Sequence, residues 1–79
     1  MDLFEKANAS IDKISFLEFL ATLRNDFINH PETWDNQSID TFLDAIQSWV
    51  EDYNGADINL ENPDWKTIAA MFYMGKIYE

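Results

Sequence analysis

The sequence predicts an all-α fold, a compact bundle of three main helices preceded by a short N-terminal element. Apolar residues recur at helical spacing over about 15–29, 39–53 and 63–78, and each segment opens with residues typical of a helix start. No segment shows the sustained apolar–polar alternation of a half-buried strand. Aromatic residues make up 15% of the chain, so large rings compensate for its shortness in forming a core. We expect one domain over residues 1–79, with residues 1–13 as an extension.

The first predicted helix begins at Ser15. Ser15 and Glu18 have the spacing of a capping box, in which each side chain accepts a hydrogen bond from a free backbone N–H. Ile14 and Phe19 stand at the positions of a hydrophobic staple. The apolar stripe that follows consists of Phe16, Leu17, Leu20, Leu23, Phe27 and Ile28. Pro31 disfavours helical geometry in the residue before it, so the helix should end shortly before that proline.

The second predicted helix follows Ser38, a favourable N-cap residue. Asp40 lies in its first turn, where an acid interacts well with the helix dipole. The apolar stripe consists of Ile39, Phe42, Leu43, Ile46, Trp49, Val50 and Tyr53. Asn54 and Gly55 both tolerate the left-handed conformation that ends many helices, so this helix is expected to end there.

The third predicted helix begins at Asn62, Pro63 and Asp64, which supply a cap, a proline at the first helical position and an acid in the first turn. Its apolar positions cover more than one face: Trp65, Ile68, Ala69, Met71, Phe72, Met74 and Tyr78. A helix that is apolar nearly all round is expected in the middle of the packing arrangement, here running to the last residue. Gly75 marks either a close approach by another backbone or a neutral exposed site.

The N-terminal segment is predicted to form one or two helical turns around Leu3, Phe4 and Ala7, followed by a loop over residues 8–12. It has neither the basic leader nor the apolar run of a signal peptide. The longest apolar run, residues 68–74, is far shorter than the roughly 20 residues of a membrane-spanning helix. We therefore expect a soluble, cytoplasmic protein.

The charge distribution is strongly one-sided. Residues 25–65 contain no lysine or arginine, yet they hold most of the acids and all three tryptophans. The formal net charge is -10 at pH 7. Contacts with nucleic acid or anionic lipid depend on basic residues that neutralise phosphate, so the sequence argues against both. A negative field attracts cationic partners instead.

The residue inventory argues against catalysis. Cysteine is absent, which excludes disulfides and thiolate chemistry. His30 is the single histidine and precedes Pro31 in a loop, without the context of a Ser–His–Asp site, so we interpret it as a helix-terminating surface residue. Two glycines cannot form a phosphate-binding loop. We expect no enzymatic activity and no cofactor.

The segment 52–61 is rich in oxygen ligands and superficially similar to a calcium-binding loop. An EF-hand loop places glycine at its sixth position and glutamate at its twelfth. Counted from Asp52, the glycine comes too early and the twelfth position is Pro63. A polar loop between helices is the favoured interpretation, and a weak, irregular cation site is the alternative.

Candidate partner-binding residues lie on the second helix and at its margins. The predicted set is Asp40, Asp44, Gln47, Glu51, Asp52, Trp34 and Trp65. The acids fall opposite the apolar stripe and form either a solvated face or a docking surface for a basic partner. Trp49 is predicted in the core. Trp34 and Trp65 either pack across the helix ends or, if exposed, serve as binding anchors.

Two motifs and the chain ending carry a resemblance to a family. They read Trp34-x-Asn36-x-Ser38-Ile39-x-x-Phe42-Leu43-x-Ala45-x-x-x-Trp49, then Pro63-x-Trp65-Lys66-x-Ile68-Ala69, then Lys76-x-Tyr78-Glu79. Over about residues 14–79 the chain resembles a bacterial domain-of-unknown-function family of short, acidic, helical proteins. The resemblance implies a bacterial origin and supports the helical fold, but it implies no activity, cofactor or catalytic residue.

Two functional hypotheses follow. The first is a non-catalytic, immunity- or antitoxin-like protein whose acidic helix covers the cationic site of a nucleic-acid-acting toxin, with Trp34 or Trp65 as anchor. The second is a structural or regulatory adaptor that acts through self-association or within a larger complex, using exposed Trp34, Tyr73 or Tyr78. The expected state is a monomer or a weak homodimer.

Overall fold

The computed structural model describes residues 2–53 and 60–78 and shows an all-α fold with a short N-terminal element, as predicted. The elements in chain order are α1 (Leu3–Asn8), α2 (Lys13–Asn29), the 3-10 helix η1 (Pro31–Thr33), α3 (Ile39–Asp52) and α4 (Trp65–Ile77). The described residues contain no strand. Nor do they include a helix long and apolar enough to cross a membrane.

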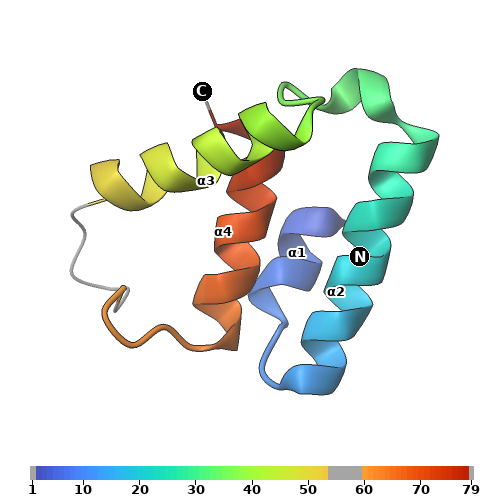
Figure 1. Cartoon of the computed structure of the whole chain (residues 1–79). Coiled ribbons are helices and arrows are strands. Elements are labelled where there is room, and N and C mark those ends of the chain that lie inside the picture. The colour runs from blue at the N-terminus through green and yellow to red at the C-terminus, as the bar shows by residue number, and fades with distance from the viewer. Residues whose placement is uncertain (1, 54–59, 79) are drawn as a thin grey trace.

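Helix α4 lies in the middle of the arrangement, as its nearly all-round apolar surface predicts. It packs against α1, α2 and α3, whereas no Cα atom of α2 lies within 8 Å of a Cα atom of α3. Figure 1 shows α3 crossing one end of α4, with α1 between α4 and α2. The bundle is therefore open on the side where α2 and α3 diverge.

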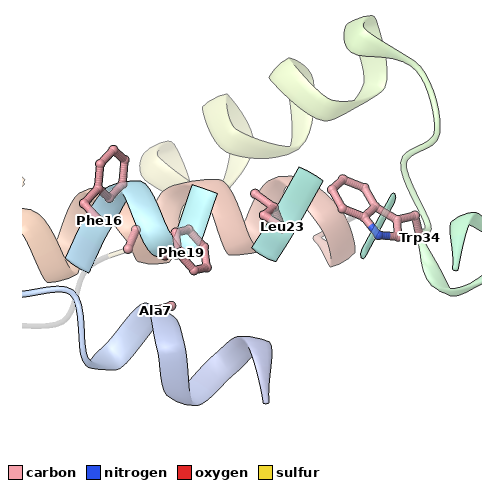
Figure 2. Close-up of a cluster of buried hydrophobic side chains, with 6 residues drawn as sticks. Ala7, Phe16, Phe19, Leu23 and Trp34 are labelled. Atoms are coloured by element: carbon pink, nitrogen blue, oxygen red, sulfur yellow. The ribbon is translucent and has the colours of Figure 1, made fainter. Parts of the chain in front are cut away.

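The core forms where α1, α2 and α4 meet. Its buried apolar residues are Ala7, Phe16, Phe19, Leu23, Trp34 and Ala69. Figure 2 shows Ala7 of α1 beneath Phe19, with Trp34 at one end of the cluster. The rings of Phe16 and Phe72 lie 5.9 Å apart between centroids and join α2 to α4. Aromatic packing thus supplies much of the core, which the high ring content of the sequence predicts.

Helix α2 begins earlier than predicted because Asp12, not Ser15, is its N-cap. The Asp12 carboxylate accepts a hydrogen bond from the backbone N–H of Ser15 at 2.8 Å, and the Ser15 hydroxyl accepts one from the backbone N–H of Asp12 at 3.1 Å. This reciprocal pair is the capping box, so the predicted Ser15–Glu18 box is wrong. The predicted staple is wrong as well, because Ile14 is 70% exposed.

This cap can be tested with a matched pair of variants. We expect Asp12→Ala to lower the melting temperature, because it removes the acceptor for the Ser15 N–H and a negative charge at the positive end of the helix. Glu18→Ala, the control on the same helix, should leave the melting temperature nearly unchanged. Thermal unfolding followed by circular dichroism measures both. An equal loss of melting temperature in the two variants would contradict Asp12 as the N-cap and favour the Ser15–Glu18 capping box.

Helix α4 begins later than predicted. The Asp64 carboxylate accepts a hydrogen bond from the backbone N–H of Thr67 at 2.8 Å, so Asp64 is the N-cap. Pro63 precedes the cap and does not occupy the first helical position. The helix ends at Ile77, and the last residue of the chain lies outside the described residues.

The apolar stripes of α2 and α3 are wider than the surfaces that neighbouring helices cover. Leu17 and Ile28 of α2 are 51% and 59% exposed. Ile39 and Leu43 of α3 are 74% and 56% exposed. Each stripe therefore extends beyond the surface that neighbouring helices bury, and Ile39 lies at the opening between α2 and α3. The predicted end of the second helix at 54–55 lies outside the described residues.

Candidate protein-binding site

The segment between η1 and α3 holds the C-terminal end of α4. The backbone N–H of Asp35 donates to the carbonyl oxygen of Lys76 at 3.1 Å. The side-chain amide of Asn36 donates to the carbonyl oxygens of Gly75 and Tyr78 at 3.1 Å and 2.8 Å. Carbonyl groups at a helix C-terminus lack partners within the helix, so these bonds satisfy them. They also fix where α3 starts relative to α4.

Asp26 connects α2 to the same end of α4. Its Oδ2 accepts hydrogen bonds from Trp34 Nε1 and from Lys76 Nζ, each at 2.8 Å. Lys76 Nζ also lies 5.9 Å from the centroid of the Trp34 ring, within cation–π range. Burial raises the pKa of Asp26, but the bonds from Lys76 and Trp34 and the charge of Lys76 outweigh burial and lower it. The Asp26 carboxylate therefore stays ionised at neutral pH.

The structure places the two candidate tryptophan anchors in different environments. Trp34 is 7% exposed, and its ring packs edge-on against Phe27 with 5.0 Å between centroids. It belongs to the core, and the little surface that it keeps lines the groove described below. Trp65 is 39% exposed and packs on Phe16 at 5.3 Å. It begins α4, at the opposite end of that helix from the α3 crossing in Figure 1.

Most of the predicted acidic site does form one exposed face of α3. Its residues are Asp40, Asp44, Gln47 and Glu51. The Gln47 amide donates to Glu51 at 3.1 Å, and within the described chain these carboxylates form no ion pair. Asp52 lies apart from this face, because it accepts a hydrogen bond from the Tyr78 hydroxyl at 2.5 Å. That bond raises the pKa of Tyr78 and ties the end of α3 to α4.

An apolar groove of about 540 Å³ lies between α2 and α3, beside this acidic face. Helix α2 contributes Leu20 and Phe27, α3 contributes Ile39 and Phe42, and α4 contributes Phe72. The rings of Phe42 and Phe72 are stacked, 6.3 Å apart and 12° from parallel. The groove is the space that the divergence of α2 and α3 leaves over the aromatic core.

Gly75 sets how closely the groove residue Phe42 approaches α4. Gly75 is buried, and a Cβ atom at this position would lie 2.5 Å from Phe42 Cε1. Of the two alternatives predicted for Gly75, a close approach or a neutral exposed site, the structure shows the close approach. The approaching group is an aromatic ring and not a backbone. The absence of a side chain at Gly75 lets Phe42 stack on Trp34 at 6.1 Å.

Gly75→Ala should destabilise the protein despite the better helix propensity of alanine. Overpacking costs about 1–3 kcal/mol, and alanine recovers about 1 kcal/mol, so we expect a net loss of about 1 kcal/mol in urea unfolding. In a Phe42→Leu background, which removes the ring, the same substitution should be neutral or stabilising. An identical effect in both backgrounds would show that Phe42 does not set the constraint at Gly75.

Sequence reasoning did not identify the groove. Leu20, Phe27, Ile39 and Phe42, which line it, belong to the predicted apolar stripes of the first and second helices. The feature of the sequence that could have indicated the groove was the width of those stripes, which exceeds what one packing partner covers. Arg24, the single charged residue among the described residues that line the groove, gave no signal because an arginine between apolar positions is common on helices.

The structure gives less support to the other candidate sites, His30 and the segment 52–61. His30 is exposed at the end of α2, and its Nδ1 lies 3.8 Å from a Glu32 carboxylate oxygen. Within residues 2–53 and 60–78, no cluster of histidine and acidic side chains is arranged to hold a metal ion. Most of the segment proposed as a weak cation site, 52–61, lies outside the described residues, so that alternative stays a prediction.

Comparison with known proteins identifies a family. The family of unknown function DUF7660 matches residues 12–79, from the N-cap of α2 to the end of the chain. No curated protein and no solved structure matches the sequence. The match includes α2, η1, α3 and α4, and therefore both walls of the groove and the acidic face, while α1 precedes it. The chain belongs to the DUF7660 family of unknown function.

Proposed function

We propose that the chain is a non-catalytic protein-binding domain of the bacterial cytoplasm and that its partner is a basic protein. One juxtaposition supports this function. The carboxylates on the acidic face of α3 pair with no lysine, arginine or histidine of the described residues, and the face adjoins Ile39 and Leu43, which are 74% and 56% exposed. Apolar surface bordered by charge is typical of protein interfaces, and the sign of the charge selects a cationic partner.

The form we favour is an immunity- or antitoxin-like protein that covers the cationic site of a nucleic-acid-acting toxin. Such a site attracts phosphate, and a helix that displays Asp40, Asp44 and Glu51 offers negative charges in the same kind of linear series. The net charge of -10 would steer the encounter and make association fast and salt-sensitive.

The alternative, an adaptor that self-associates through aromatic residues, has weaker support. Trp34 is buried, and Tyr73 and Tyr78 are half-buried, so none of the three is the fully exposed aromatic residue that this alternative needs. Two copies of a chain with charge -10 also repel each other. Exposed Phe4, at 53%, and Ile11, at 78%, are the observations that keep the adaptor as a second candidate.

Partner capture at low and high salt tests the proposed function. We expect Asp40→Lys/Asp44→Lys to abolish capture of a basic protein from the source cell at low salt. Glu18→Lys/Glu32→Lys changes the net charge equally but on α2 and η1, and it should retain most of the capture. High salt should weaken capture by the unchanged protein. Equal capture by the two variants, or capture insensitive to salt, would contradict the role of the acidic face.

A further inference from the structure

The groove between α2 and α3 restricts the kind of partner that fits it. We propose that it binds an amphipathic α-helix, with the apolar side of that helix in the groove and lysine or arginine residues facing α3. The inference rests on the proposed function and specifies the element of the basic partner that makes contact. Helices that dock this way present anchors at helical spacing to a preformed apolar channel.

The chemistry of the groove favours a helix over an extended peptide. An extended peptide needs partners for its backbone N–H and C=O groups, whereas a helix satisfies most of them internally. The polar side chains at one end of the groove are already engaged within the protein. Asn36 donates to carbonyl groups of α4, Gln37 donates to the carbonyl groups of Pro31 and Trp34, and Ser38 caps α3. The rest of the lining is almost entirely apolar.

The charges around the groove determine which side of the ligand helix should carry its basic residues. Helical spacing on α3 places Leu43 between the groove residue Ile39 and the acids Asp40 and Asp44. The ligand therefore meets apolar surface first and carboxylates immediately beyond it on that side. The opposite wall carries Arg24. A second copy of this acidic chain would bring like charges together at α3, whereas a basic helix brings opposite charges together.

A designed peptide tests the groove directly. The probe is a helical peptide of about 18 residues made of leucine and lysine, with its leucines on one face, and the control is a scrambled peptide of the same composition. In amide NMR spectra of the labelled protein, we expect the amphipathic peptide to shift the Trp34 indole N–H and the amides of Leu20, Ile39 and Phe42. The scrambled peptide should shift only the acidic face.

Two isoleucine variants provide the matched comparison. Ile39 and Ile14 are 74% and 70% exposed, and both lie in the first turn of a helix, but only Ile39 lines the groove. Ile39→Asn should weaken the amphipathic peptide about tenfold, because the apolar contact is lost. Ile14→Asn should leave its affinity unchanged.

The outcomes separate this inference from the proposed function. Peptide binding that Asp40→Lys/Asp44→Lys abolishes, but that Ile39→Asn does not change, would overturn the groove and leave the acidic face intact. Binding insensitive to that charge reversal would contradict the proposed function itself. Concentration-dependent self-association in sedimentation, lost in Ile39→Asn, would make a second copy the occupant and overturn the inference.

Discussion

Trp34→Ala is expected to reduce the free energy of unfolding by about 3–5 kcal/mol, the usual cost of truncating a buried tryptophan. The ring packs on Phe27 and Phe42, and its N–H donates to Asp26. Alanine would leave a cavity between α2 and α3 and remove one of the two donors that hold the Asp26 carboxylate. Denaturant unfolding followed by far-ultraviolet circular dichroism measures the loss without relying on tryptophan fluorescence.

Trp65→Ala is the matched control for this prediction. Trp65 is 39% exposed, so its truncation removes less buried surface and should cost clearly less. An equal or greater loss for Trp65→Ala would mean that Trp34 is not the tryptophan on which the core depends. The exposed fractions also distinguish the two tryptophans as candidate binding anchors, because Trp65 keeps far more surface that a partner can reach.

Asp26→Ala should cost about 2 kcal/mol at neutral pH. Breaking a fully buried ion pair costs about 3–5 kcal/mol, and the effect is smaller here because the Asp26 and Lys76 side chains are 23% and 14% exposed. A double-mutant cycle with Lys76→Met should give a coupling energy of about 1–2 kcal/mol. Additive losses in the cycle would show that the two charges do not stabilise the fold through each other.

The Asp26–Lys76 pair should make the stability of the protein depend on pH, and the direction of this dependence can be predicted. The pKa of Asp26 is lower in the folded chain than its ordinary value, so its contribution is present above about pH 5 and is lost as the pH falls below about 4. Asp26→Asn should therefore destabilise the protein more at pH 7 than at pH 3. Some acid sensitivity should remain in the variant, because the pKa values of Asp12 and Asp64 are lowered as well.

The helices were predictable because local sequence carries most of their signal. Apolar spacing, Ser38 as an N-cap and the all-round apolar surface of α4 are properties of neighbouring residues. The start at Asp12 was not predicted because two overlapping capping patterns compete there, and the start at Asp64 was not predicted because Pro63 is itself favourable at a first helical position. Asp12–Ser15 and Ser15–Glu18 are both plausible capping pairs, and the choice depends on small differences in hydrogen-bond geometry.

The opening between α2 and α3 was not predictable from periodicity. Ile39 and Leu43 continue the α3 stripe, but a stripe records which residues are apolar and not whether a neighbour covers them. The placement of α2 and α3 around α4 depends on contacts between distant segments, such as Asn36 with the end of α4 and Asp26 with Lys76. No local pattern shows that these residues meet.

The candidate site was predictable in part for the same reason. Asp40, Asp44, Gln47 and Glu51 share a face because of helical spacing alone, and the structure keeps them together. Asp52 was grouped with them because it is adjacent in sequence, whereas its bond to Tyr78 depends on the docking of α4. The groove needs α2, α3 and α4 at once, so only the folded chain shows it.

The affinity of the leucine–lysine peptide as a function of salt tests the central claim most directly, namely that the acidic face and the groove form one binding surface. Asp40→Asn/Asp44→Asn should flatten the dependence of the dissociation constant on salt, because it removes the charges that salt screens. Ile39→Asn should weaken binding by the same factor at low and high salt and leave the slope unchanged. A surface made of charge alone would instead bind the peptide equally well in Ile39→Asn and unchanged protein at every salt concentration, and that result would contradict the claim.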